Sequence, residues 1–256
     1  MSSHITTKTL LRQLTKNREY NAPLVNVAER NCHEDVEIIG NSIRIRDKIS
    51  KTYLFSVANW DELEVLLEDT GEELDTFMIN NGIYKKEVLH KFPRAIICEY
   101  DFYVMNKKEN LCGSQPIKNF EIVNLDLNWL NFILVRYKDK EFSNERYISD
   151  RILYGKGLGL LHEGEKKVAF VLQHKNGETG ALVVEQKYRG RGLGGEFLKH
   201  FNRVLFENNS ILFALVEKNN IAGAKTMVNG GYKKSKQRYH LGVPYEKRYT
   251  ISSVGQ

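Results

Sequence analysis

A run of three glycines and two arginines, RGRGLG at residues 189–194, has the residue types of an anion-binding turn. Alternating glycines let the chain turn tightly and let a ligand approach the backbone without meeting a Cβ atom. Where a helix begins after such a turn, its first N–H groups lack partners and the helix dipole adds positive charge. Guanidinium groups beside these donors favour two linked phosphates. The predicted phosphate-binding residues are Arg189, Gly190, Arg191, Gly192, Leu193 and Gly194.

Two other interpretations of this turn stay open. The glycines at 190, 192 and 195 also satisfy the dinucleotide spacing G-x-G-x-x-G, and Glu217 ends the next expected strand, where a ribose-binding acid would lie. Three features argue against a dinucleotide-binding turn. The preceding strand is expected to pair through a hairpin, and too few residues follow for a doubly wound sheet. The turn also contains two arginines, whereas dinucleotide-binding turns usually have small, neutral residues. The other alternative is a glycine-rich turn with a purely structural role.

Glu178 is the candidate for proton transfer. It opens the strand that leads to the turn, eleven residues before Arg189. A carboxylate at this place could act as a general base. A glutamate after an Asn-Gly turn is otherwise usually a solvated turn residue, so the residue itself leaves both roles open.

The histidines indicate no metal site and no further reactive group. They have neither ligand spacing nor an adjacent nucleophile, and each is expected at the surface or in packing. These residues are His162, His174, His200 and His240.

Strands and helices that could position the turn follow from residue periodicity and turn residues. In the first half we expect strands at 36–39, 43–45 and 95–100 and a helix at 61–67. In the second half we expect helices at 129–137, 143–153, 192–207 and 221–228, and strands at 157–161, 167–173, 178–185, 210–216 and 232–241. The Asn176-Gly177 pair indicates a tight hairpin, and the strand at 232–241 is expected to close the sheet.

The segment 106–118 has the composition of a linker, which predicts two domains, 1–118 and 119–256. The first is expected to be a mixed α/β domain without an indicated function.

The formal net charge of +6 favours an anionic partner, which could be a phosphorylated cofactor, nucleic acid or an acidic membrane surface. No apolar run approaches membrane-spanning length, so no membrane insertion is predicted. Cys32, Cys98 and Cys112 are expected to be reduced thiols of an intracellular protein.

The N-terminus has two interpretations. Lys8, Arg12, Lys16 and Arg18 precede the first acidic residue, and nearby leucines share one helical face. This pattern resembles a mitochondrial transit segment, and the alternative is the first helix of the domain. A mitochondrial location is therefore expected, with a cytoplasmic location as the alternative.

The order of elements resembles the GNAT (Gcn5-related N-acyltransferase) superfamily. Its signature is a strand, an R-x-x-G-x-G turn, a helix, a strand and then Asn followed by Gly-aromatic, here Asn220 and Gly231-Tyr232. Tyr232 replaces the usual Phe. The spacing of Arg146-Tyr147-Ile148, Gly177-Glu178 and Tyr188-Arg189 most resembles the animal glycine N-acyltransferase family.

This resemblance implies an α/β (α+β) GNAT fold, a mixed and mostly antiparallel central sheet flanked by helices. The N-terminal half would be a degenerate copy. It also implies acyl-CoA as co-substrate, no metal, and acyl transfer to glycine or another small amine by direct attack in a ternary complex. Nucleic acid is not an implied partner, and the oligomeric state is not indicated. Glu178 matches the catalytic glutamate proposed for glycine N-acyltransferases.

Further site residues follow from the same resemblance. Backbone groups of Leu182, Val183 and Val184 would bind the pantetheine amides, one N–H would polarise the thioester carbonyl, and Asn220 would lie at the cofactor. Many GNAT enzymes have a tyrosine acid seven residues after this Asn, whereas this chain has Met227. Met227 therefore keeps a non-catalytic acyl-CoA-binding pseudoenzyme as an alternative function. A protein or peptide N-acetyltransferase is a further alternative.

Overall fold

The computed structural model of the protein describes residues 6–68, 76–93, 95–106, 116–138 and 142–244. The chain divides into two compact units, and neither is one continuous stretch. The first unit comprises Met1–Phe102, Val216–Asn219 and Ser235–Gln256, and the second comprises Tyr103–Leu215 and Asn220–Lys234. The predicted domain boundary after residue 118 stays a prediction, and residues 107–115 of the predicted linker lie outside the described residues.

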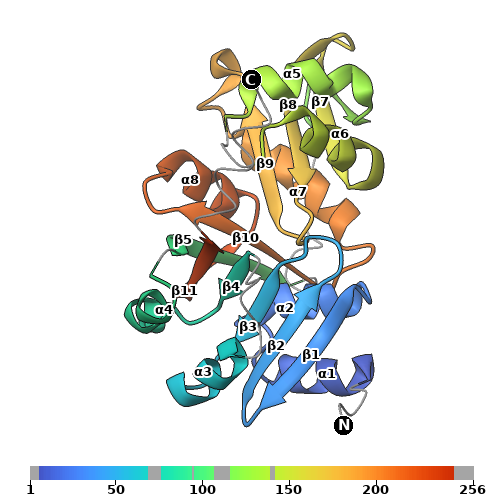
Figure 1. Cartoon of the computed structure of the whole chain (residues 1–256). Coiled ribbons are helices and arrows are strands. Elements are labelled where there is room, and N and C mark those ends of the chain that lie inside the picture. The colour runs from blue at the N-terminus through green and yellow to red at the C-terminus, as the bar shows by residue number, and fades with distance from the viewer. Residues whose placement is uncertain (1–5, 69–75, 94, 107–115, 139–141, 245–256) are drawn as a thin grey trace. The chain divides into compact units, whose positions relative to one another are not determined.

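Helices and strands of the first part of the chain follow one another in alternating groups (Figure 1). They are α1 (Thr7–Leu14), η1 (Thr15–Asn17), α2 (Ala22–Glu29), β1 (His33–Ile39), β2 (Ser42–Asp47), β3 (Tyr53–Ser56), α3 (Trp60–Glu68), β4 (Phe77–Ile79), η2 (Gly82–Tyr84), α4 (Lys85–Lys91) and β5 (Ala95–Asn106). The strands and the helix predicted in this half are confirmed, although β5 runs six residues further than the predicted 95–100.

The second part continues this alternation. Its elements are β6 (Phe120–Asn124), η4 (Leu127–Trp129), α5 (Leu130–Arg136), α6 (Glu145–Tyr154), β7 (Gly157–His162), β8 (Lys166–Gln173), β9 (Thr179–Val184), η5 (Gln186–Tyr188), α7 (Leu193–Leu205), β10 (Ile211–Glu217), α8 (Ile221–Asn229) and β11 (Lys233–Pro244). Every helix and strand predicted here is confirmed within a few residues, because amphipathic periodicity and turn glycines mark them clearly.

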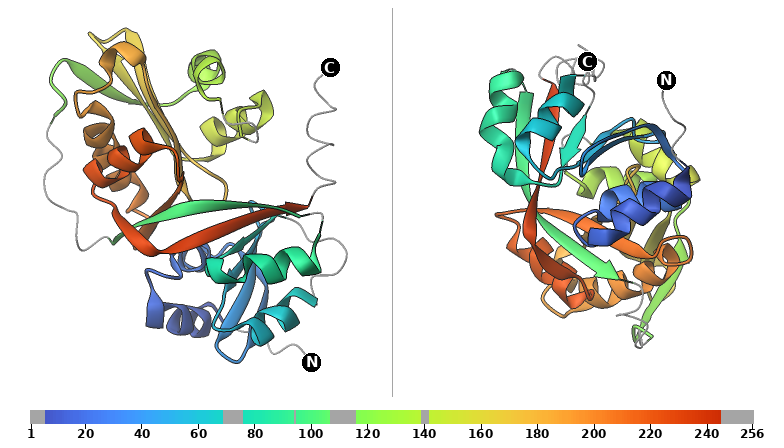
Figure 2. Two further views of the ribbon diagram at one scale, coloured as in Figure 1. Left: turned by 90° about the vertical axis from the view of Figure 1, so that its left-hand side faces the viewer. Right: turned by 90° about the horizontal axis from the view of Figure 1, so that it is seen from below.

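The strands form two sheets. One has the order β1-β2-β3-β4-β11-β5-β10, and the other has the order β6-β7-β8-β9. Pairing is antiparallel throughout the second sheet, whereas β3 and β4 of the first sheet pair in parallel. The strand β11 was expected to close the sheet of the second half, but it lies between β4 and β5 (Figure 2). A strand pattern predicts that a segment is extended, and it does not identify the neighbours.

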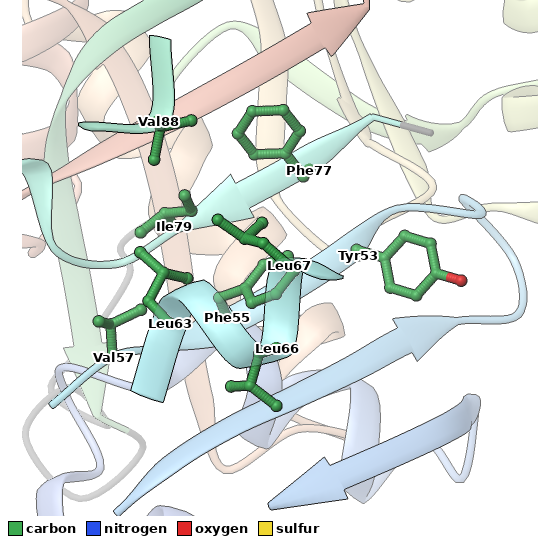
Figure 3. Packing of buried hydrophobic residues seen from close by; sticks show 9 residues of the cluster. All are labelled: Tyr53, Phe55, Val57, Leu63, Leu66, Leu67, Phe77, Ile79 and Val88. Carbon is green, nitrogen blue, oxygen red and sulfur yellow. The ribbon is translucent and has the colours of Figure 1, made fainter. Parts of the chain in front are cut away.

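The core of the first unit lies between α3 and strands β3 and β4 (Figure 3). Phe55, Leu63 and Phe77 have no exposed surface there. Helix α1 also belongs to this unit, because Leu10 and Leu14 are completely buried. The basic N-terminal segment therefore contains a helix of the fold from Thr7 onward. The mitochondrial location stays a prediction.

The core of the second unit holds the helix that follows the glycine-rich turn. On α7, Phe197, Leu198 and Phe201 are completely buried, which is the apolar stripe expected of an amphipathic helix. A Cβ atom at Gly195 would lie 2.6 Å from Cβ of Asn229 in α8. The two helices therefore pack so closely that only glycine fits at position 195 without movement.

The same order of elements occurs twice in the chain. After two helices, the first half continues strand, strand, strand, helix, strand, helix, strand from β1 to β5. After α5 and α6, the second half repeats this order from β7 to β11. Helix α3 thus corresponds to α7, and the turn before α3 corresponds to the glycine-rich turn. The degenerate N-terminal copy implied by the resemblance agrees with this repeat.

None of the helices in the described part of the chain has both the length and the apolar character needed to cross a membrane.

Candidate functional site

The glycine-rich turn lies between η5 and α7, and its backbone conformation requires glycine. Gly190 has φ +76° and Gly192 has φ +75°, both in the left-handed region that residues with a Cβ atom rarely adopt. A Cβ atom added at either position would meet no atom within 4 Å. The two glycines therefore face open space, and a ligand could approach their backbone directly.

The N–H groups of this turn are available to a ligand. Inside the turn, the N–H groups of Gly195 and Glu196 bond the carbonyl of Gly192 at 3.1 and 3.2 Å. The N–H groups of the five residues before them, 190–194, have no hydrogen-bond partner in the described part of the chain. Residues 189–192 are exposed, and no side chain caps α7. This is the arrangement of donors that a helix N-terminus offers to an anion.

The turn carries two arginines, Arg189 and Arg191, and they differ in their contacts. Arg191 is exposed without a partner among the described residues. Arg189 donates from Nε to the carbonyl of Val184 at 2.7 Å, so it also ties the turn to the end of β9. Positive charge is therefore concentrated beside the unpaired N–H groups.

Strand β9 contains a bulge beside the turn. Its pairing with β8 shifts between Phe170↔Val183 and Leu172↔Gly180, so one extra residue lies on β9. Ala181 takes φ +49° at this point. A left-handed conformation costs a residue with a Cβ atom about 1–3 kcal/mol. Such a cost is typical of functional sites, where a bulge changes the direction of backbone groups.

The edge of β9 away from β8 has no strand partner in the described part of the chain, because β9 is the last strand of its sheet. The N–H of Glu185 points to β8 and bonds the carbonyl of Val168 at 2.8 Å. Backbone groups of Val184 therefore point to the open edge, where Arg189 contacts the carbonyl. An extended amide chain could add to such an edge by hydrogen bonding, as predicted for residues 182–184.

Glu178 directly precedes β9 and reaches across to β10. Its Oε1 accepts a hydrogen bond of 3.0 Å from the backbone N–H of Leu215. The side chain is half-buried. Since β9 and β10 belong to different sheets, the carboxylate bridges two strands that do not pair with each other. Glu178 is therefore a fixed carboxylate at the end of the open strand edge and not a freely solvated turn residue.

A buried hydrogen-bond network lies behind this strand. The hydroxyl of Tyr232 donates to the side-chain oxygen of Asn202 at 3.0 Å, and its oxygen lies 2.8 Å from the Thr179 hydroxyl, within hydrogen-bond distance. Burial raises the pKa of Tyr232 well above its ordinary value. Asn202 in turn donates to the carbonyl of Gly230 at 3.1 Å. Tyr232, which replaces the family's usual phenylalanine, thus has a structural role, because its hydroxyl links β9 to α7.

Asn220 and Met227 both have local structural roles. The side chain of Asn220 caps α8 by accepting a hydrogen bond of 2.8 Å from the N–H of Gly223. Asn220 is exposed, and its role at a cofactor stays a prediction. Met227 has only 7% of its surface exposed, and a thioether cannot donate a proton. Neither residue supplies an acid for a leaving thiolate.

Sequence reasoning assigned the histidines to surface or packing, which overlooked one close contact. His174 is buried, its Nδ1 lies 2.7 Å from the Tyr147 hydroxyl, and its ring lies against Gly180 of β9. The sequence could not predict this contact, because residue 174 lies near the bulge only through the pairing of β8 with β9. The His240 side chain lies outside the described residues. No cluster of three possible metal ligands occurs in the described part of the chain.

Comparisons with known proteins agree with this geometry. Residues 157–241 match the family model described as FR47-like protein, which runs from β7 into β11 and includes the whole turn. No match was found among curated protein sequences.

Several solved structures have a similar fold over nearly the whole chain. A Drosophila protein has a TM-score of 0.67 at 17% identity, covering 93% of this chain and 96% of its own. A GCN5-related N-acetyltransferase from Kribbella flavida has a TM-score of 0.55 at 11% identity, covering 88% and 95%. A tandem GNAT protein from the clavulanic acid biosynthesis pathway has a TM-score of 0.50 at 9% identity, covering 95% and 96%.

The chain therefore has the predicted GNAT fold, with mixed, mostly antiparallel sheets flanked by helices. The repeated order of elements agrees with the similarity to a tandem GNAT protein. Nothing in these matches supports the narrower resemblance to glycine N-acyltransferases.

Proposed function

We propose that the protein is an acyl-CoA-dependent N-acyltransferase that transfers an acyl group to the amino group of a small acceptor. The observation that carries this proposal is the turn at 190–194, with five N–H groups that have no partner among the described residues. Such donors, with Arg191 beside them, suit the diphosphate of coenzyme A. The GNAT fold supports the same cofactor.

In this proposal, the open edge of β9 binds the pantetheine arm and the bulge directs an N–H group at the thioester carbonyl. An N–H group fixed in this direction would stabilise negative charge on the carbonyl oxygen during attack. The amine attacks directly in a ternary complex, and Glu178 accepts the proton that the amine loses. With Met227 in place of an acid, the thiolate leaves without a proton from that position.

The acceptor is proposed to be glycine or another amino acid, on the resemblance of the segments 146–148, 177–178 and 188–189 to glycine N-acyltransferases. A mitochondrial location is part of this proposal. The decisive assay measures thiol release from a panel of acyl-CoAs against amino acids, simple amines and peptides. Turnover with peptides alone would instead favour a protein or peptide N-acetyltransferase.

A substitution in the turn tests cofactor binding. Gly192→Asp places a side chain and a negative charge at a left-handed position that faces open space. Because both would oppose a diphosphate, we expect coenzyme A binding in calorimetry to fall below detection.

Gly164→Asp is the matched control, because Gly164 has φ +76° in the turn between β7 and β8. It introduces the same charge and similar backbone strain in a different turn, whose N–H groups are not proposed to bind the diphosphate, and affinity should be kept. If Gly192→Asp also kept its affinity, the turn would not be the diphosphate site.

A pseudoenzyme that binds acyl-CoA without turnover is the second candidate function. The observation that favours it is Met227, which is buried and cannot act as an acid. Binding of acyl-CoA by the wild type, with no thiol release over the whole acceptor panel, would establish this alternative.

A further inference from the structure

A hydrogen-bonded tyrosine–histidine pair lies outside the residues assigned so far and contacts the strand that would carry the thioester. The Tyr147 hydroxyl and Nδ1 of His174 are 2.7 Å apart. Tyr147 lies in the first turn of α6, and His174 follows the end of β8. Only 8% of the histidine is exposed. A buried polar group such as this imidazole needs a hydrogen-bond partner, and the half-buried Tyr147 supplies it, so the two side chains constrain each other.

The histidine ring occupies the space above Gly180. A Cβ atom at residue 180 would lie 2.3 Å from Cδ2 and 2.4 Å from Nε2 of His174. Real side chains never approach this closely, so the ring and glycine at 180 require each other. Gly180 directly precedes Ala181, the left-handed residue of the bulge. The ring therefore packs on the strand immediately beside its strained residue.

Tyr147 is itself held at both ends. The side chain of Asn144 accepts a hydrogen bond from its backbone N–H at 2.8 Å, which caps α6. The backbone N–H of Lys175 donates to the Tyr147 hydroxyl oxygen at 3.4 Å, so the hydroxyl proton is available for Nδ1 of His174. The ring of Phe142 lies 4.9 Å from the imidazole. These contacts fix the orientation of the imidazole.

We infer that Tyr147 and His174 are positioning residues, which hold the bulge of β9 in the conformation that directs a backbone N–H at the thioester carbonyl. This inference rests on the proposed function. A contact at the bulge should affect the reacting carbonyl more than cofactor affinity, because the diphosphate is held separately by residues 190–194. The pair thus contributes to turnover and little to binding.

Two variants disturb the pair from opposite sides. Tyr147→Phe removes the hydroxyl and keeps the ring, and Gly180→Ala introduces the Cβ atom that displaces the imidazole. Tyr154→Phe is the matched control, because Tyr154 is on the same helix with 79% of its surface exposed. Thermal unfolding and coenzyme A affinity are measured for each protein, so that a folding defect is separated from a positioning defect.

The decisive measurement is the ¹³C resonance of the carbonyl in bound acetyl-CoA labelled at that carbon, together with turnover. In the wild type, hydrogen bonding should shift this resonance downfield. We expect the shift to shrink in Tyr147→Phe and Gly180→Ala, kcat to fall about tenfold or more, and coenzyme A affinity to stay within about twofold. Tyr154→Phe should match the wild type.

The carbonyl readout does not depend on the acceptor, so it also applies to a protein that binds acetyl-CoA without turnover. Normal coenzyme A binding with unchanged carbonyl resonance and kcat in both variants would overturn the inference alone. A wild type that does not bind coenzyme A would overturn the proposed function and the inference with it.

Discussion

At the scale of single residues, Glu178 and the turn glycines have different tasks. The glycines leave backbone donors exposed, and their role depends on the absence of side chains. Glu178 supplies a carboxylate at a fixed place, because the N–H of Leu215 holds one of its oxygens. Binding and proton transfer can therefore be separated by substitution.

Replacing Glu178 by Gln should affect turnover and leave binding intact. The amide oxygen can still accept the hydrogen bond from Leu215, but the side chain can no longer take a proton from the amine. We expect kcat to fall by roughly 10²- to 10⁴-fold, with coenzyme A affinity unchanged, in a thiol-release assay with matched calorimetry.

Glu163→Gln is the control for this change, because Glu163 has 80% of its side chain exposed in the turn between β7 and β8. Its turnover should equal that of the wild type. Undiminished turnover in Glu178→Gln would remove Glu178 from the mechanism.

At the scale of elements, an ion cluster joins three parts of the first unit. Glu99 on β5 accepts hydrogen bonds from Lys218, after β10, and from Lys85 on α4. These two hydrogen bonds lower the pKa of Glu99 from an ordinary 4.5 to about 2. The ionised carboxylate is thus favoured in the folded protein, which links stability to pH.

The lowered pKa of Glu99 predicts how the thermal stability of Glu99→Gln depends on pH. The stabilisation is fully present above pH 4.5, the ordinary pKa, and is lost as the pH falls toward about 2. We expect the variant to melt below the wild type at pH 7 and the difference in Tm to shrink steadily between pH 5 and pH 3, measured by circular dichroism.

Glu64→Gln serves as comparison, because Glu64 is on the exposed side of α3 and lies 3.9 Å from Lys91. Such a surface ion pair contributes little to stability. The Tm of Glu64→Gln should therefore match that of the wild type at pH 7 and across the range from pH 5 to pH 3. A difference between wild type and Glu99→Gln that stayed constant with pH would contradict the ionic origin.

At the scale of the whole molecule, the repeated order of elements raises the question of a second cofactor site. The turn between β3 and α3 corresponds to the glycine-rich turn, but it has no glycine, and two of its N–H groups are occupied by distant side chains. Val57 donates to Asn80 at 2.9 Å and Ala58 donates to Ser42 at 2.9 Å. Asn59 accepts from the N–H of Glu62 and caps the helix.

The strands beside the two turns also differ, because those of the first copy pair with each other and those of the second copy do not. β3 and β4 pair in parallel through Tyr53–Phe55, whereas the corresponding β9 and β10 lie in different sheets. An extended ligand could join the open edge of β9, but between β3 and β4 the backbone groups already bond each other. The first copy therefore differs from the second in both features that the proposed cofactor site uses.

We accordingly predict one coenzyme A per chain. Calorimetric titration of the wild type should give a stoichiometry of one, and Gly192→Asp should show no remaining heat of binding. A stoichiometry of two, or a residual site in Gly192→Asp, would mean that the first copy also binds the cofactor.

The sequence by itself determined the elements and the turn, because both depend on local rules. Periodicity marked the amphipathic α7, Asn176-Gly177 marked the hairpin, and the glycines at 190 and 192 marked left-handed positions at a helix start. These signals come from neighbours in the chain, so they need no knowledge of long-range contacts.

Only the tertiary structure decided which distant segments meet. It placed β11 between β4 and β5, bound Glu178 to Leu215, and brought the ring of His174 onto Gly180 beside the bulge. It also showed that the N–H groups of Val57 and Ala58 in the first copy's turn are occupied, which the sequence did not reveal because their partners Asn80 and Ser42 are far from that turn in sequence. Strand pairing and side-chain packing select these contacts by long-range complementarity, which no local pattern encodes.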